Sequence, residues 1–349
     1  MHPELEKYRT DRRLVLTKTG SDARSQEVGM LFLYAYDCIN DAEWHWLRFH
    51  YSMLPPHPTA LEIATICASL ERALPGLGKQ LVDSIASLKN REKHKPDYES
   101  MLQIFAEMLV INQVFKLSWP GEVEFSYEPA GRSGKRPELL VLCDGQQFLF
   151  EVKAPSLLSH MEMRQAREWQ VPGRVLPLEG IQTLARGEPI TLPRDNPVKD
   201  FLVSADEKFA DFEPEDGANI LVIVWDDFIY EPITSLVNER TGLLMEGSYF
   251  RDGEDEAIEF PNVDGVIVIR HLSYFYEGLA DRPLPDRAGP FDFGAIGSLP
   301  NVAFPTRWGR AVPAFIYDGL RAVDYRDEGL QRFADYRPQD VVMWIGDRS

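Results

Sequence analysis

Two short apolar runs, separated by an aspartate and a glycine, most constrain how this chain folds. Residues 139–143 and 148–152 are rich in residue types that favour strands, and the Asp-Gly pair at residues 144–145 is typical of a tight hairpin turn. Successive side chains on a strand point to opposite faces, so Glu151 and Lys153, at the end of the second run, are expected to share one face. The sequence therefore predicts a β-hairpin that carries an acid and an amine side by side.

A second acid precedes the first run. Glu138 comes directly before residue 139, so in the hairpin it is expected on the strand next to Glu151. Two carboxylates and an ammonium on neighbouring strands suit a hard divalent cation and an activated water. The structural alternative is that Glu151 and Lys153 form only a same-face ion pair on an exposed strand.

The spacing of these residues resembles that of a known nuclease superfamily. Pro137-Glu138, followed after twelve residues by Glu151-Val152-Lys153, resembles the PD-(D/E)xK motif. The first acid of that motif is usually Asp and is Glu here, which the superfamily tolerates. The resemblance covers about residues 97–270. It implies an α/β fold of restriction-endonuclease-like type, with a mixed central sheet and an αβββαβ core.

The same resemblance implies a function. The chain would be a Mg²⁺-dependent endonuclease or phosphodiesterase that hydrolyses nucleic acid, DNA in preference to RNA, in restriction, repair or anti-phage defence. The implied catalytic residues are Glu138, Glu151 and Lys153, with Lys153 hydrogen-bonded to the attacking water and offsetting charge on the phosphate. The implied ligands of Mg²⁺ or Mn²⁺ are Glu107, Glu138, Glu151 and the carbonyl of Val152. The alternative is a catalytically inactive subunit of a larger complex with the same fold.

Five basic side chains near the motif are candidates for contacts with substrate phosphates. Three cluster around the Gly-rich turn at residues 128–135, and two lie in the expected helix at residues 156–170: Arg132, Lys135, Arg136, Arg164 and Arg167. The structural alternatives are a solvated turn and ordinary surface ion pairs.

The chain is expected to form three regions. Residues 1–95 form a helical N-terminal region with a polar arm at residues 1–22, residues 96–270 form the nuclease-like domain, and residues 271–349 form an irregular C-terminal extension packed on that domain. Helical periodicity and apolar runs predict the individual elements. Helices are expected at residues 23–53, 57–74, 78–88, 97–117, 156–170 and 198–209, strands at 121–127, 219–225 and 264–270, and a long insertion at 171–197.

Four side chains with metal-binding potential are interpreted as structural. His45 and His50 lie in an aromatic cluster, and they are expected to pack or to form an interface because HExxH spacing is absent. Asp226, together with the aspartate that follows it, ends the strand at residues 219–225, where acids are usually turn residues. None of these residues is expected to bind a metal.

Charge, cysteine content and the length of apolar runs indicate which partners and which cellular compartment are expected. The net charge of −18 argues against a general nucleic-acid coat, although residues 130–200, with ten Lys/Arg and nine Asp/Glu, escape the acidity of the remainder. Three distant cysteines without CxxC spacing predict a reducing compartment and no disulfide framework. With no apolar leader or run of about eighteen apolar residues, a cytoplasmic protein is expected, with nucleic acid, a protein partner or a second copy as partners and no membrane.

Overall fold

The computed structural model describes residues 23–42, 44–88, 95–174, 178–212, 216–284, 286–295 and 297–343. The chain divides into two compact units. Residues 1–116 and 274–298 form what we call the helical unit, and residues 117–273 and 299–349 form the sheet unit. The polar arm expected at residues 1–22 lies outside the described residues.

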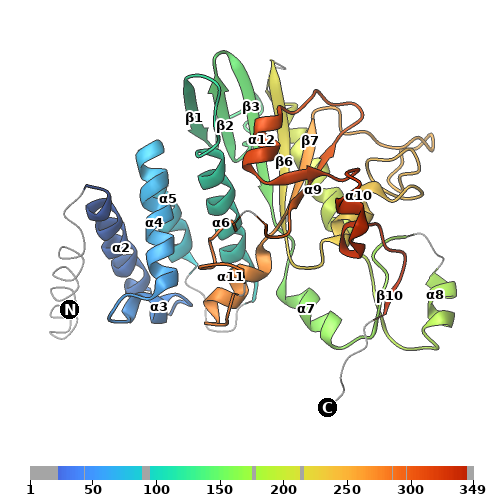
Figure 1. The fold of residues 1–349 in the computed structure, drawn as a ribbon, viewed down its shortest axis with the longest axis horizontal. Coiled ribbons are helices and arrows are strands. Elements are labelled where there is room, and N and C mark those ends of the chain that lie inside the picture. Colours follow the sequence, from blue (N-terminus) through green and yellow to red (C-terminus); the bar gives the residue numbers. More distant parts are fainter. Residues whose placement is uncertain are drawn as a thin grey trace. The chain divides into compact units, whose positions relative to one another are not determined.

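Amphipathic helices build the helical unit, and α2, α4 and α5 pack against one another (Figure 1). Its core contains Phe32, Ile63 and Leu81, which are almost fully buried. The single helix predicted over residues 23–53 is wrong, because the structure divides it into two helices, and Arg48 donates to the carbonyls of Asn40 and Ala42 at the break. The helices are α2 (Ala23–Asp41), α3 (Arg48–Ser52), α4 (Pro58–Ala73), α5 (Leu77–Ser87) and α6 (Lys95–Val114), with most of α11 (Leu272–Leu279).

A mixed seven-stranded sheet organises the sheet unit, which gives the chain an α/β fold. The strand order is β1-β2-β3-β6-β7-β8-β9. β1, β2 and β3 are antiparallel neighbours, β3, β6 and β7 are parallel, β8 runs antiparallel to β7, and β9 runs parallel to β8. The strands are β1 (Val123–Tyr127), β2 (Leu139–Cys143), β3 (Gln146–Lys153), β6 (Gly217–Trp225), β7 (Gly265–Arg270), β8 (Asn301–Pro305) and β9 (Ala322–Asp324).

The predicted hairpin is confirmed. Asp144 and Gly145 both have positive φ, 48° and 82°, as the two-residue turns that fit the twist of a hairpin require. β2 and β3 pair antiparallel, with Leu139 opposite Phe150. β6 and β7, predicted as continuous apolar strands, are buried along nearly their whole length. The centre of the sheet is therefore covered on both faces.

Helix α9 connects β3 to its parallel neighbour β6 and covers one face of the sheet. Val198, Leu202, Ala205 and Phe209 recur at helical spacing and pack into a core with Leu149 and with side chains of β6, β7 and β8. The helices of this unit are α7 (Leu158–Gln165), α8 (Leu178–Leu184), α9 (Asp195–Phe209), α10 (Tyr230–Val237) and α12 (Ala314–Gly319), with the 3₁₀ turns η1 (Leu330–Arg332) and η2 (Ala334–Tyr336).

Two segments differ from expectation. The expected helix at residues 156–170 ends at Gln165, and residues 169–170 form β4 of a small second sheet in the order β10-β4-β5. The C-terminal segment, expected to be irregular, supplies β8 and β9 to the main sheet and β10 to the small one. The additional strands are β4 (Trp169–Gln170), β5 (Ile190–Thr191) and β10 (Val342–Met343). Among the described residues, no helix has the length and apolar composition needed to cross a bilayer.

Candidate functional site

The register of the hairpin brings the two predicted acids together. Because Leu139 pairs with Phe150, continuing the same register puts Glu138 opposite Glu151. Directly opposed residues of antiparallel strands have Cβ atoms only about 5 Å apart. Alternation along β3 puts Glu151 and Lys153 on the face of Leu149, which packs against α9. Glu138, Glu151 and Lys153 therefore converge on the α9 face of the sheet.

Four charged side chains meet there, and we call them the hairpin cluster. The Nζ atoms of Lys153 and Lys208 each lie 2.6 Å from Oε1 of Glu151, and Lys208 Nζ lies 3.8 Å from Oε1 of Glu138. Glu151 has no exposed surface and Glu138 is 8% exposed, whereas both lysine side chains are 21% exposed. Two carboxylates thus face two ammonium groups of equal and opposite total charge, and the lysines are the most exposed members of the cluster.

Lys208 was not predicted as a site residue. It lies near the end of α9, three residues after Ala205 and directly before Phe209, which both pack on the sheet. Residues three apart on a helix share a face, so Lys208 lies at the margin of the packed stripe and reaches Glu151. In the sequence the only signal was a lysine flanking this apolar stripe.

The residues present fit a hard divalent cation. Oε2 of Glu151 is buried and has no hydrogen-bond partner among the described residues. A buried carboxylate oxygen without a partner is costly, and carboxylate oxygens are the ligands that Mg²⁺ and Mn²⁺ prefer. Glu138 and Glu151 are therefore the residues that would hold such an ion. Val152 is fully buried and pairs with Val222 of β6, and the ligand role of its carbonyl stays a prediction.

Glu107, the other predicted ligand, belongs to the helical unit. It lies on α6, where it is partly buried and accepts a hydrogen bond from Gln103 Nε2 at 3.0 Å. Because Glu138 and Glu151 belong to the sheet unit, the role of Glu107 at their site stays a prediction.

Two of the predicted phosphate contacts hold the turn at residues 128–136 against the end of α9. The guanidinium of Arg132 donates to the carbonyls of Ala210 and Asp211, so it occupies carbonyls left free at the helix end. Lys135 forms an ion pair of 2.9 Å with Glu207 on the surface. Arg136 is exposed and makes no ion pair with another described residue, which leaves it open to a ligand.

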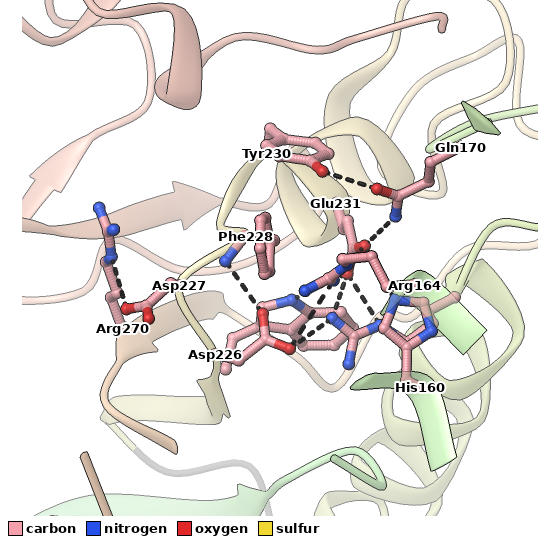
Figure 2. A network of polar contacts seen from close by, with 11 residues as sticks. His160, Arg164, Gln170, Asp226, Asp227, Phe228, Tyr230, Glu231 and Arg270 are labelled. Atoms are coloured by element: carbon pink, nitrogen blue, oxygen red, sulfur yellow. Dashed lines mark hydrogen bonds and ion pairs between the residues drawn. The ribbon is translucent and has the colours of Figure 1, made fainter. Parts of the chain in front are cut away.

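Arg164 lies in a buried polar network instead of on the surface. Figure 2 shows it beside His160 and Gln170, where all three side chains contact Glu231. Its Nη2 lies 2.8 Å from Glu231 Oε1, and its guanidinium stacks over the ring of Phe228 at 3.3 Å from the ring centre. With its side chain only 9% exposed, Arg164 cannot reach a phosphate in this structure. The predicted substrate contact therefore finds no support at this residue.

The other predicted arginine also has an internal partner. Arg167 is partly buried, and its Nη1 donates to the carbonyl of Ile190 at 2.8 Å. That bond links the segment after α7 to β5. Its expected contact with substrate stays a prediction.

The same network fixes the end of β6. Arg194 is 7% exposed and donates to both Asp226 and Glu231. Together with Arg164, it balances the charges of these two carboxylates. Burial alone would raise the pKa of Glu231, but Arg194, His160 and Arg164 hold it well below its usual range. Burial lowers the pKa of His160 and outweighs the opposing hydrogen bond to Glu231. We interpret this network as a structural anchor.

Asp226 and Asp227 support the interpretation as turn residues. Oδ1 of Asp226 accepts the backbone N–H of Phe228 at 3.0 Å, and Asp227 pairs with Arg270 at 3.3 Å (Figure 2). Both carboxylates thus have internal partners at the end of β6.

Among the sites predicted from sequence, the hairpin cluster is the one in which the predicted catalytic residues meet in space. Comparison with known proteins gave no significant match: no family model, no curated protein and no solved structure matches this chain.

Proposed function

We propose that the chain is a metal-dependent nuclease of the PD-(D/E)xK type, which hydrolyses phosphodiester bonds at the hairpin cluster. The observation that carries the proposal is the convergence of Glu138, Glu151 and Lys153 on one face at the end of the hairpin. The chain order also supports it. Three antiparallel strands, a crossover helix and a strand parallel to the third form the series β1-β2-β3-α9-β6, which is compatible with the βββαβ part of the expected αβββαβ core.

The carboxylates define the cation site in this mechanism. Glu138 and Glu151 would hold Mg²⁺ or Mn²⁺, with the buried Oε2 of Glu151 as the available donor. A bound ion of this kind supplies Lewis-acid activation of the phosphate and lowers the pKa of a nearby water.

Lys153 supplies the positive charge nearest to the reaction. Its ammonium lies 2.6 Å from Glu151 and reaches solvent, so it can donate a hydrogen bond to the attacking water and to a phosphate oxygen. Fixed positive charge placed where negative charge develops lowers the barrier most. We assign Lys153 this electrostatic role, with Lys208 holding the Glu151 carboxylate in position from α9.

The substrate assignment depends on charge. Arg136 is exposed next to Pro137 and Glu138, so it is the basic side chain best suited to a backbone phosphate near the cluster. The chain as a whole has a net charge of −18, which opposes non-specific binding along nucleic acid. We therefore favour a substrate held at a few phosphates, and the motif resemblance implies DNA in preference to RNA.

One observation favours the alternative of a catalytically inactive subunit. Lys153 and Lys208 both contact Oε1 of Glu151 and already neutralise the two carboxylates. A cluster balanced in this way is stable without an ion. In an inactive protein the same residues would serve only to join α9 to the hairpin.

A cleavage assay separates these functions. Wild-type protein is incubated with plasmid, single-stranded DNA and RNA in Mg²⁺ or Mn²⁺, beside the variants Glu138→Gln and Lys153→Met. We expect divalent-ion-dependent cleavage that each variant reduces by about 100-fold or more. The melting temperature should fall by only a few degrees, so that each variant stays folded at the assay temperature. The matched control is Lys199→Met, also on α9, whose ammonium pairs with Asp200 and not with the hairpin cluster; it should cut like wild type.

Two results would count against catalysis. Cleavage by Lys153→Met at the wild-type rate would remove that residue from the mechanism. Wild-type protein that cuts none of these substrates and binds no Mn²⁺ in calorimetry would establish the inactive alternative, because a catalytic site of this kind must bind the ion.

A further inference from the structure

A second group of potential metal ligands lies within the helical unit. His50 on α3, His57 directly before α4 and Asp281 after α11 come from three separate segments. One ligand atom from each lies within 4.8 Å of the others, and the rings of the two histidines are 4.6 Å apart, edge to face. We call this group the histidine cluster.

A packing role does not explain the ring nitrogens of His50, both unpaired within the described part of the chain. It is 4% exposed, and neither ring nitrogen has a hydrogen-bond partner among the described residues. The backbones of Trp46 and Leu279 come near enough to affect its charge state, but neither forms a hydrogen bond of normal geometry. Buried polar groups are rarely left unpaired, and an ion is one of the few explanations for such a group.

His57 and Asp281 supply the other two donors. Nε2 of His57 lies 2.7 Å from Oδ1 of Asp281, while Nδ1 accepts the backbone N–H of Thr59 at 3.2 Å. Without an ion, the proton of His57 is therefore on Nε2 and is shared with Asp281. An ion that binds Nε2 must displace this proton to Nδ1, at the cost of the bond from Thr59.

The cluster also has a route to solvent. The side chain of Asp281 is 53% exposed, whereas that of His57 is 8% exposed. A carboxylate at the surface with imidazoles behind it allows an ion to enter from water and to be held by buried nitrogens. The site is therefore open to solvent at Asp281 and closed at the two histidines.

We propose that His50, His57 and Asp281 bind a divalent first-row transition ion, with Zn²⁺ as the preferred occupant. Two imidazoles and one carboxylate suit Zn²⁺, whereas the carboxylates of the hairpin cluster suit Mg²⁺. Three protein ligands leave a fourth position of the tetrahedron for water. The bound ion joins α3, the start of α4 and the segment after α11. This site is independent of the proposed nuclease function, because it uses none of the same residues.

Binding is tested on the full-length, tag-free protein after removal of metals. Zn²⁺ is titrated against a competing chromophoric chelator, and Co²⁺ is added separately to record its visible spectrum. We expect one Zn²⁺ per chain, a tetrahedral Co²⁺ spectrum and a melting temperature raised by about 4 °C when free Zn²⁺ is 100 times its Kd.

Two variants that preserve local structure test the ligands. Asp281→Asn keeps an acceptor for His57, and His57→Asn keeps a residue that caps α4 well. Each should weaken Zn²⁺ binding by about tenfold or more, which is the loss that disturbed metal sites commonly show. The control is Glu277→Gln on α11, which pairs with Arg282 and should bind Zn²⁺ like wild type.

The proposal is overturned if wild-type protein binds neither Zn²⁺ nor Co²⁺, or if both ligand variants bind as tightly as wild type. Glu138→Gln, which disables the proposed nuclease site, should leave Zn²⁺ binding unchanged. Loss of one function therefore leaves the other measurable.

Discussion

Replacing Lys208 by Met tests how the hairpin cluster is held together. The substitution removes the ammonium 2.6 Å from Oε1 of Glu151 and keeps most of the apolar stem. A hydrogen bond to a charged group contributes about 1.5–3 kcal/mol. Lys153 remains on the same oxygen and Lys208 is 21% exposed, which both limit the loss. We therefore expect the free energy of unfolding to fall by about 2 kcal/mol.

The assay is urea unfolding of Lys208→Met beside Lys199→Met. Lys199 lies on the same helix, is 25% exposed and pairs at 2.9 Å with Asp200, whose side chain is 67% exposed. Surface pairs of this kind contribute at most about 1 kcal/mol, so Lys199→Met should lose much less stability. Equal losses in the two variants would refute the idea that contact with the buried carboxylate makes Lys208 special. A loss below about 0.5 kcal/mol in Lys208→Met, within the range of ordinary surface substitutions, would do the same.

Three further predictions concern the buried network and the substrate. Glu231→Gln should lower the free energy of unfolding by about 3 kcal/mol in urea, because it removes a charge that compensates buried Arg194. The folded state lowers the pKa of His160, so neutral His160 contributes its full stabilisation above about pH 6.5, and this stabilisation is lost as the pH falls toward the pKa of the folded state. His160→Gln should therefore flatten the slope of the free energy of unfolding against pH. Arg136→Ala should reduce the salt slope of DNA binding by about one, whereas Arg164→Met should change stability and not that slope.

The hairpin could be predicted because its signals are local. The Asp-Gly turn between two apolar runs fixes the register, and the register alone brings Glu138 opposite Glu151. The apolar runs of β6 and β7 likewise identify buried strands without knowledge of their neighbours. β8 and β9 carried no such signal, since they are short and one of them ends in proline.

The remaining site residues depend on partners far along the chain. Arg164 resembles any helical surface arginine until Glu231, 67 residues later, is placed beside it. Lys208 gains its role only when α9 packs on the sheet and meets Glu151, 57 residues earlier. His57 and Asp281 are separated by 224 residues. Such pairings follow from tertiary packing, which neither spacing nor composition reveals.

The path of the chain between β7 and β8 determines where this protein can be truncated. The two strands are antiparallel neighbours, yet the residues that connect them, 274–298, are part of the helical unit. Phe275 and Phe291, both in this segment, pack edge to face against Phe105 of α6. Removing residues 1–116 would strip these rings of their partner and leave an orphaned loop in the middle of the sheet. A shortened protein must lose both pieces together, with a brief linker rejoining Ser273 to Leu299.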